Sequence, residues 1–258
     1  MALSVRLLGI CSVFAITAAA QWLNYPTPGI PRTADGKPNL NAPVPKTADR
    51  KPDLSGIWLV ADNTYFMSLT GDAKDDPVPY QPWAKAVVDQ HVAAQHKDDP
   101  LALCLPPGVP RVNTNVFHPF KIIQTQREVI MLYETSANDV FREVFTDGRP
   151  LPKDPQPSWK GYSVGKWDGD TFVVDTIGFN DRGWLDTEKG RPQTEALHVT
   201  ERFHRTNFGT LDIGITIDDP KAYTKPWSSK MTVHLQPDTE LLETVCENQR
   251  GLEHLLTK

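Results

Sequence analysis

The sequence predicts an all-β protein with one short helix, built as an antiparallel β-barrel or sandwich. After Phe117 the chain runs through short segments rich in β-branched and aromatic residues, with Gly, Asp or Pro between them. In Leu211–Ile217, Leu and Ile alternate with Asp, Gly and Thr, which is typical of a strand with one buried face. Helical segments do not alternate with these strands, so a parallel α/β fold is excluded.

Residues 1–20 predict a secretory signal peptide. Arg6 supplies the positive start, Leu7–Thr17 is apolar, and the alanines at 18–20 offer small residues for cleavage before Gln21. The alternative is a membrane anchor, but the apolar run is shorter than the ~20 residues that a spanning helix needs. We therefore expect a periplasmic or secreted protein with no stable membrane anchor.

Residues 21–52 are rich in proline and polar side chains. Thr33–Leu40 and Thr47–Leu54 repeat the pattern Thr-Ala-Asp-x-Lys-Pro-Asn/Asp-Leu, and two copies are too few for a stacked repeat fold. We expect an extended segment packed along the surface of the domain. The alternative is a ligand for a proline-recognising partner protein.

The main domain is expected over residues 53–258. It opens with a strand at Asp53–Trp58, and a helix follows over Gln81–Gln95, where apolar residues recur at spacings of three and four. The prolines of Cys104–Arg111 predict a rigid turn, because proline cannot donate to a sheet ladder.

The remaining elements are short strands. They are predicted at Phe120–Gln124, Val129–Glu134, Val140–Thr146, Ser163–Trp167, Thr171–Thr176, Ala196–His204, Thr210–Ile217, Lys230–Leu235 and Glu240–Cys246. An Asp168-Gly169 turn joins two of them into a hairpin. This succession, opening at Gly56-x-Trp58, resembles the lipocalin-type (calycin) barrel, whose interior commonly holds one small ligand.

The cysteines predict a disulfide. Cleavage of the signal peptide would remove Cys11 and leave Cys104 and Cys246, an even number in an oxidising compartment. The alternative is two separate buried thiols, each acting as a small apolar residue. Neither cysteine has a spacing typical of a zinc site, so no metal is expected, although a site assembled from separate strands stays open.

The charge of the chain restricts its partners. The formal net charge is −5, and the absence of a Lys/Arg block argues against nucleic acid and against anionic membrane surfaces. The expected partner is a small molecule or another protein, and no cofactor is expected. The oligomeric state is not predicted.

The stretch Gly161–Trp227 resembles a widespread group of secreted bacterial proteins of uncharacterised function. The resemblance rests on Gly-x-Ser-x-Gly-x-Trp-acidic-Gly-Asp-Thr, Gly-Phe-Asn, Glu-Ala-Leu-His-Val-x-Glu-Arg and Asp-Pro-x-Ala-Tyr-x-x-Pro-Trp motifs, which stand here at 161–171, 178–180, 195–202 and 219–227. It extends to Cys104–Arg111 and the region of Cys246. The resemblance implies a family but no activity.

Three charged residues alternate with Val or Phe on predicted strands, namely Arg142, Asp175 and Glu201. An unpaired buried charge costs several kcal/mol, so such groups pair, shift their pKa or face a wet cavity. One interpretation is a structural Arg–carboxylate pair. The other is a polar cluster in a ligand cavity, which would supply an acid or a base.

The long loop over residues 178–194 is the second candidate region. It carries Asn180, Trp184 and Asp186, and Glu195 follows it directly. Loops of this length in a compact domain are usually functional or disordered. We predict that these four residues and Arg142 contact a ligand, with the loop as a lid and Trp184 as its aromatic wall. The alternative is a packed surface loop.

Two functions follow from these observations. The first is an exported barrel that binds a small, partly apolar molecule in the cavity of the barrel. The alternative is a cofactor-independent hydrolase or isomerase in which His198 and a carboxylate, Asp175 or Glu201, act as acid and base in the mouth of the barrel. Ser163 matches a Gly-x-Ser-x-Gly nucleophile motif, but no helix follows it, so a serine hydrolase is rejected.

Overall fold

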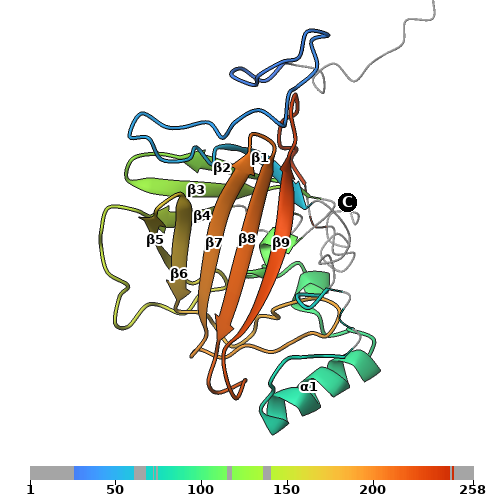
Figure 1. Cartoon of the computed structure of the whole chain (residues 1–258). Coiled ribbons are helices and arrows are strands. Elements are labelled where there is room, and N and C mark those ends of the chain that lie inside the picture. The colour runs from blue at the N-terminus through green and yellow to red at the C-terminus, as the bar shows by residue number, and fades with distance from the viewer. Residues whose placement is uncertain are drawn as a thin grey trace, which may run out of the picture.

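The computed structural model describes residues 26–60, 68–71, 73, 75–114, 118–135, 141–244 and 246. The predicted signal peptide and Cys11 lie outside this part of the chain. Within it, nine strands form one closed sheet, accompanied by one α-helix (Figure 1). The strands are β1 (Gly56–Val60), β2 (Phe120–Gln124), β3 (Glu128–Tyr133), β4 (Phe141–Phe145), β5 (Tyr162–Asp168), β6 (Thr171–Ile177), β7 (His198–Asn207), β8 (Thr210–Asp218) and β9 (Trp227–Leu235). The helix is α1 (Pro82–Ala93), and the 3-10 turns are η1 (Pro100–Leu103) and η2 (Arg111–Thr114).

Each strand pairs with the next in sequence, and β9 pairs with β1 to close the barrel. The predicted class, an all-β barrel with one helix, is confirmed, and the strand order is that of an up-and-down barrel. All neighbouring pairs are antiparallel except β4 and β5, which run parallel. Strand directions cannot alternate throughout a closed ring with an odd number of strands, so at least one neighbouring pair has to be parallel.

The parallel pair β4–β5 is a weak seam in the barrel. Its ladder contains only the pairs Val144↔Ser163 and Phe145↔Val164. Because the two strands start at the same end, the connection over residues 146–161 returns along the barrel, as Figure 1 shows. Side chains that cross this seam therefore matter more for closure than they would elsewhere.

The inward-facing apolar side chains of the strands belong to one continuous buried cluster. Trp58, Phe172 and Phe203 are at most 1% exposed, and the apolar face of β8 is completely buried, as its alternation predicts. The same cluster includes Leu185 and Leu197 from the β6–β7 connection and Tyr223 from the β8–β9 connection. These connections are thus part of the folded core.

The prediction of a final strand at Glu240–Cys246 is wrong for residues 240–244, which form no ladder. The physical reason is that β9 already pairs with β1, so the barrel has no free edge for a tenth strand. The predicted helix is confirmed with shorter bounds, and it lies at the lower end of the barrel in Figure 1. None of the helices in the described residues is long and apolar enough to cross a membrane.

The proline-rich segment packs over the opposite, upper end (Figure 1). Its two sequence repeats form the same turn twice: the Thr33 and Thr47 hydroxyls each donate to an Asp two residues on and to a Lys carbonyl four residues on. The carbonyl of Leu40 accepts a hydrogen bond from the Gly209 N–H in the β7–β8 turn, at 2.8 Å. The Ala42 carbonyl accepts in the same way from the Phe208 N–H, so the segment is bonded to the barrel rim at residues 40–42.

Candidate functional site

A pocket of about 460 Å³ lies at the lower end of the molecule, between α1 and the 178–194 loop. Its volume lies within the range of small-molecule sites. The helix contributes Trp83, Val87 and His91, and the loop and its continuation contribute Arg182, Trp184 and Glu195. We call it the helix–loop pocket. It combines an apolar wall with a few polar groups of both charges.

Arg191 fixes the loop that forms one side of this pocket. The side chain is completely buried, and its guanidinium donates to Asp186 within the loop, to Asp76 at 2.9 Å and to the Tyr80 hydroxyl at 2.7 Å. Burial would lower the pKa of Arg191, but the neighbouring carboxylates and Tyr80 outweigh it and raise the pKa. Burial raises the pKa of Asp186 despite this arginine. The loop is thereby bonded to the segment before α1.

A second buried arginine anchors the middle of the loop. Arg111 of η2 binds both carboxylate oxygens of Asp99, at 2.8 and 2.6 Å, and donates to the Thr187 hydroxyl at 2.6 Å. Bidentate pairs of this kind hold both partners in one geometry. In this structure the loop is packed through two buried arginines, and its residues form one wall of the helix–loop pocket.

The pocket contains a stacked aromatic pair. The rings of His91 and Trp184 lie 4.2 Å apart at an angle of 25°, and His91 Nδ1 lies 2.7 Å from the Gly190 carbonyl oxygen. Because a carbonyl only accepts hydrogen bonds, Nδ1 carries the proton. In the neutral ring this leaves Nε2 as an acceptor, so the apolar wall also offers a hydrogen-bonding site.

The barrel interior holds a separate polar cluster across the β4–β5 seam. Arg142 donates to Glu201 at 2.6 Å, to the Thr176 hydroxyl at 2.9 Å and to the Ser163 hydroxyl at 3.1 Å. Burial would lower the pKa of Arg142, but the adjacent carboxylate outweighs it and the pKa is raised. Asn113 of η2 donates to the other oxygen of Glu201 at 2.7 Å. Arg142 and Glu201 thus form the buried pair that the alternation of charges allows.

Asp175 and His198 meet on the outer face of the barrel. His198 Nε2 lies 3.1 Å from Asp175 Oδ1, which also accepts from the Thr200 hydroxyl at 2.8 Å. The side chain of His198 is 39% exposed and that of Asp175 is 25% exposed. Asp175 pairs with Thr200 on β7, and Glu201 is the next residue of that strand. Its side chain therefore points to the opposite face, into the barrel, where it is completely buried. The three predicted catalytic residues therefore divide into an outer pair and an inner carboxylate.

The five predicted ligand contacts are also divided. Trp184 and Glu195 line the helix–loop pocket, whereas Arg142 lies inside the barrel. Asn180 is buried, and its side chain accepts from the Arg182 N–H. Asp186 is buried against Arg191. Sequence reasoning did not select Trp83, Val87 or His91, because helix periodicity assigns a residue to a face but does not show what that face meets.

Comparisons with known proteins assign no family. The sequence matches no family model and no curated protein, so the likeness to the secreted bacterial group stays an expectation. Among solved structures, the chain is similar to a variant of the fluorescent protein UnaG, with 11% identity over 71% of this chain and 96% of that one. The TM-score is 0.32, so the likeness carries no further argument. The barrel assignment rests on the strand order.

Proposed function

We propose that this is an exported protein that binds a small, partly apolar molecule in the helix–loop pocket. The observation that carries the proposal is the construction of that pocket: an aromatic and aliphatic wall faces a few charged groups, on a loop held by Arg111 and Arg191. A preformed site of this kind loses little conformational entropy when a ligand binds.

The charged groups define the polar part of the ligand. Glu195 and Asp181 offer carboxylates, and Arg182 and Lys221 offer cations, all at the pocket wall. Because the pocket wall carries both positive and negative groups, it favours a ligand with hydrogen-bond donors and acceptors over a ligand with a single large charge. Its apolar part would lie against Trp83 and Val87.

A pocket-filling variant tests this site. We expect Val87→Trp to remove binding, because an indole at this position occupies the pocket. Native mass spectrometry of the purified protein and thermal unfolding against a small-molecule library are the two measurements. A ligand at 100 times its Kd should raise the Tm of the unmodified protein by about 5–10 °C and leave that of Val87→Trp unchanged.

The matched control is Ala86→Trp, which places the same side chain on the exposed side of α1. It should bind like the unmodified protein. Equal binding by Val87→Trp and Ala86→Trp would place the ligand elsewhere and contradict the proposal.

The enzymatic alternative is supported by the Asp175–His198 contact, because a carboxylate that orients a histidine is a common acid–base arrangement. If the pair acts on a substrate, His198→Gln should lower turnover of an ester or an isomerisable carbonyl compound by about 10²–10⁴-fold. Under the binding proposal, His198→Gln leaves ligand affinity unchanged, because the pair lies outside the helix–loop pocket. A library of chromogenic esters assayed with both proteins decides between them.

A further inference from the structure

Arg205, near the end of β7, differs from the other buried arginines. Four arginines are buried in the described part of the chain. Arg111, Arg142 and Arg191 each lie within ion-pair distance of a carboxylate, at Asp99, Glu201 and Asp186. Among the described residues, the guanidinium of Arg205 donates only to backbone carbonyls, those of Asp53, Asn207 and Phe208. Its charge is thus buried without a direct counterion in the part of the chain that the structure describes.

The surroundings of Arg205 are apolar. The guanidinium lies 4.9 Å from the ring centroids of both Trp58 and Phe208, and the side chain is 3% exposed. Burial lowers the pKa of this arginine to about 10, and Asp53 only partly opposes the effect. The arginine therefore remains charged at neutral pH, in a place where an anion would be favoured.

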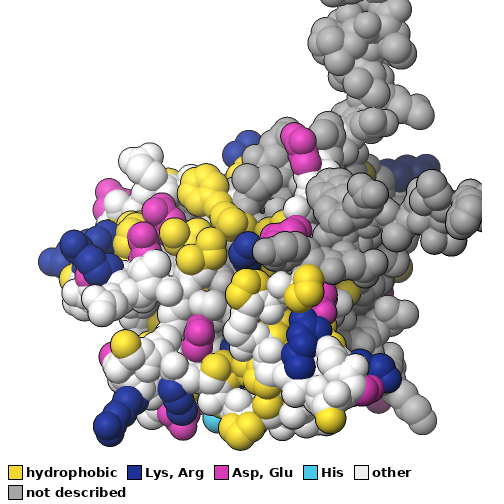
Figure 2. All heavy atoms as spheres, turned by 90° about the horizontal axis from the view of Figure 1, so that it is seen from above, with side chains coloured by type: hydrophobic (Ala, Val, Ile, Leu, Met, Phe, Trp, Pro, Cys, Tyr) yellow, Lys and Arg dark blue, Asp and Glu magenta, His cyan; other side chains and the backbone are white. Residues whose placement is uncertain are grey.

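A pocket of about 290 Å³ adjoins Arg205 at the upper rim of the barrel. Ile57 of β1, Leu235 of β9 and Phe208 form part of its wall, and the proline-rich segment adds Ile30. Figure 2 looks onto this end and shows hydrophobic side chains interspersed with basic and acidic ones. We call it the rim pocket. It lies at the opposite end of the barrel from the helix–loop pocket.

The two carboxylates of the rim pocket, Asp53 and Glu240, each have a partner other than the Arg205 guanidinium. Asp53 Oδ1 accepts from the Ser55 N–H at 2.8 Å, and Glu240 lies 3.7 Å from the Lys121 ammonium. Neither lies within ion-pair distance of Arg205. An incoming anion would therefore meet a guanidinium without a direct counterion, and charge-assisted bonds to such a group are stronger than neutral ones.

We propose that the rim pocket binds a small amphiphilic anion, whose carboxylate meets Arg205 and whose hydrocarbon part lies against Ile30, Ile57 and Leu235. The proline-rich segment is then one wall of a binding site. This inference does not depend on the proposed function, because the two pockets share none of their lining residues.

Octanoate and octan-1-ol are the probes that test the site, since they share a hydrocarbon chain and differ in charge. Isothermal titration calorimetry should show octanoate binding at least tenfold more tightly than the alcohol, because a hydrogen bond to a charged group contributes on the order of a tenfold factor or more. Arg205→Met should reduce octanoate affinity to that of the alcohol.

Three other variants keep the test decisive if Arg205→Met does not fold, since that change leaves three carbonyls without their donor. Ile30→Trp fills the rim pocket from the proline-rich segment and should weaken octanoate binding at least tenfold. Lys37→Trp, at an exposed position of the same segment, should not. Val87→Trp should leave octanoate binding intact, which separates this site from the helix–loop pocket. Equal affinity for the acid and the alcohol, no octanoate binding at millimolar concentration, or unchanged binding by Ile30→Trp would each overturn the proposal.

Discussion

Replacing Glu201 by Gln is expected to lower the free energy of unfolding by about 3–5 kcal/mol, because the Arg142 guanidinium would remain buried without its counterion. Glu201 is completely buried and accepts from both Arg142 and Asn113. A Gln amide has only one acceptor oxygen, so its NH₂ group would face a donor. In a chain of this size the loss corresponds to a fall in Tm of about 6–20 °C, measurable by denaturant unfolding with linear extrapolation.

Two control variants test whether the loss of stability comes from the Arg142–Glu201 pair. Glu143→Gln changes an exposed carboxylate next to Arg142 on β4 and should shift stability by no more than about 0.5 kcal/mol. The double variant Arg142→Met with Glu201→Leu should recover most of the stability, since a buried pair replaced by apolar groups is often neutral. A loss below about 1 kcal/mol for Glu201→Gln would contradict the buried cluster at the β4–β5 seam.

The barrel could be predicted from the sequence because strand signals are local. The alternation in β8 and the hairpin turn between β5 and β6 each depend on a few neighbouring residues, and both appear in the structure. The turn residues are Gly169 and Asp170, one position later than the predicted Asp168–Gly169, because Asp168 still pairs with Thr171.

The charge alternation correctly indicated that Arg142 and Glu201 face the core. The same reasoning was wrong for Asp175, which lies on the outer face beside His198. The parallel β4–β5 pair could not be predicted in this way, because it follows from the number of strands in the closed ring.

The candidate sites were harder to predict because they join segments that are far apart in the sequence. His91 of α1 stacks on Trp184, and Arg191 reaches back to Asp76 and Tyr80. Nothing in the local pattern of either segment specifies its partner. The final predicted strand at Glu240–Cys246 is wrong for a similar reason, since whether an edge is free depends on the closure of the whole barrel.

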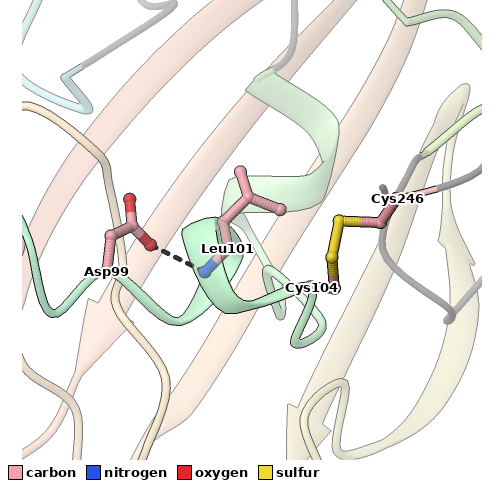
Figure 3. Close-up of a disulfide and its surroundings, with 4 residues drawn as sticks. All are labelled: Asp99, Leu101, Cys104 and Cys246. Atoms are coloured by element: carbon pink, nitrogen blue, oxygen red, sulfur yellow. Dashed lines mark hydrogen bonds between the residues drawn. A yellow bond between two sulfur atoms is a disulfide. The ribbon is translucent and has the colours of Figure 1, made fainter. Parts of the chain in front are cut away.

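The disulfide is expected to contribute up to about 5 kcal/mol to stability in the chain-entropy model. Cys104 and Cys246 are joined, with Cα atoms 5.7 Å apart and a sequence separation of 142 residues, which confirms the predicted pairing. Cys104 directly follows η1, where Asp99 accepts from the Leu101 N–H at 2.9 Å (Figure 3). Because Asp99 also binds Arg111, the bond ties the end of the chain to a well-anchored segment before β2.

Reduction should therefore destabilise the protein, and the variant with both Cys104→Ser and Cys246→Ser should show the same loss without any response to reductant. Denaturant unfolding with and without dithiothreitol measures both. Free-thiol titration of denatured, unreduced protein recovered after export should find essentially no reactive thiol. The intact mass of that protein should lack residues 1–20, which checks the proposed export in the same sample. Two titratable thiols would show that the bond does not form, and the stability of the closed barrel would then rest on its strand pairing and core alone.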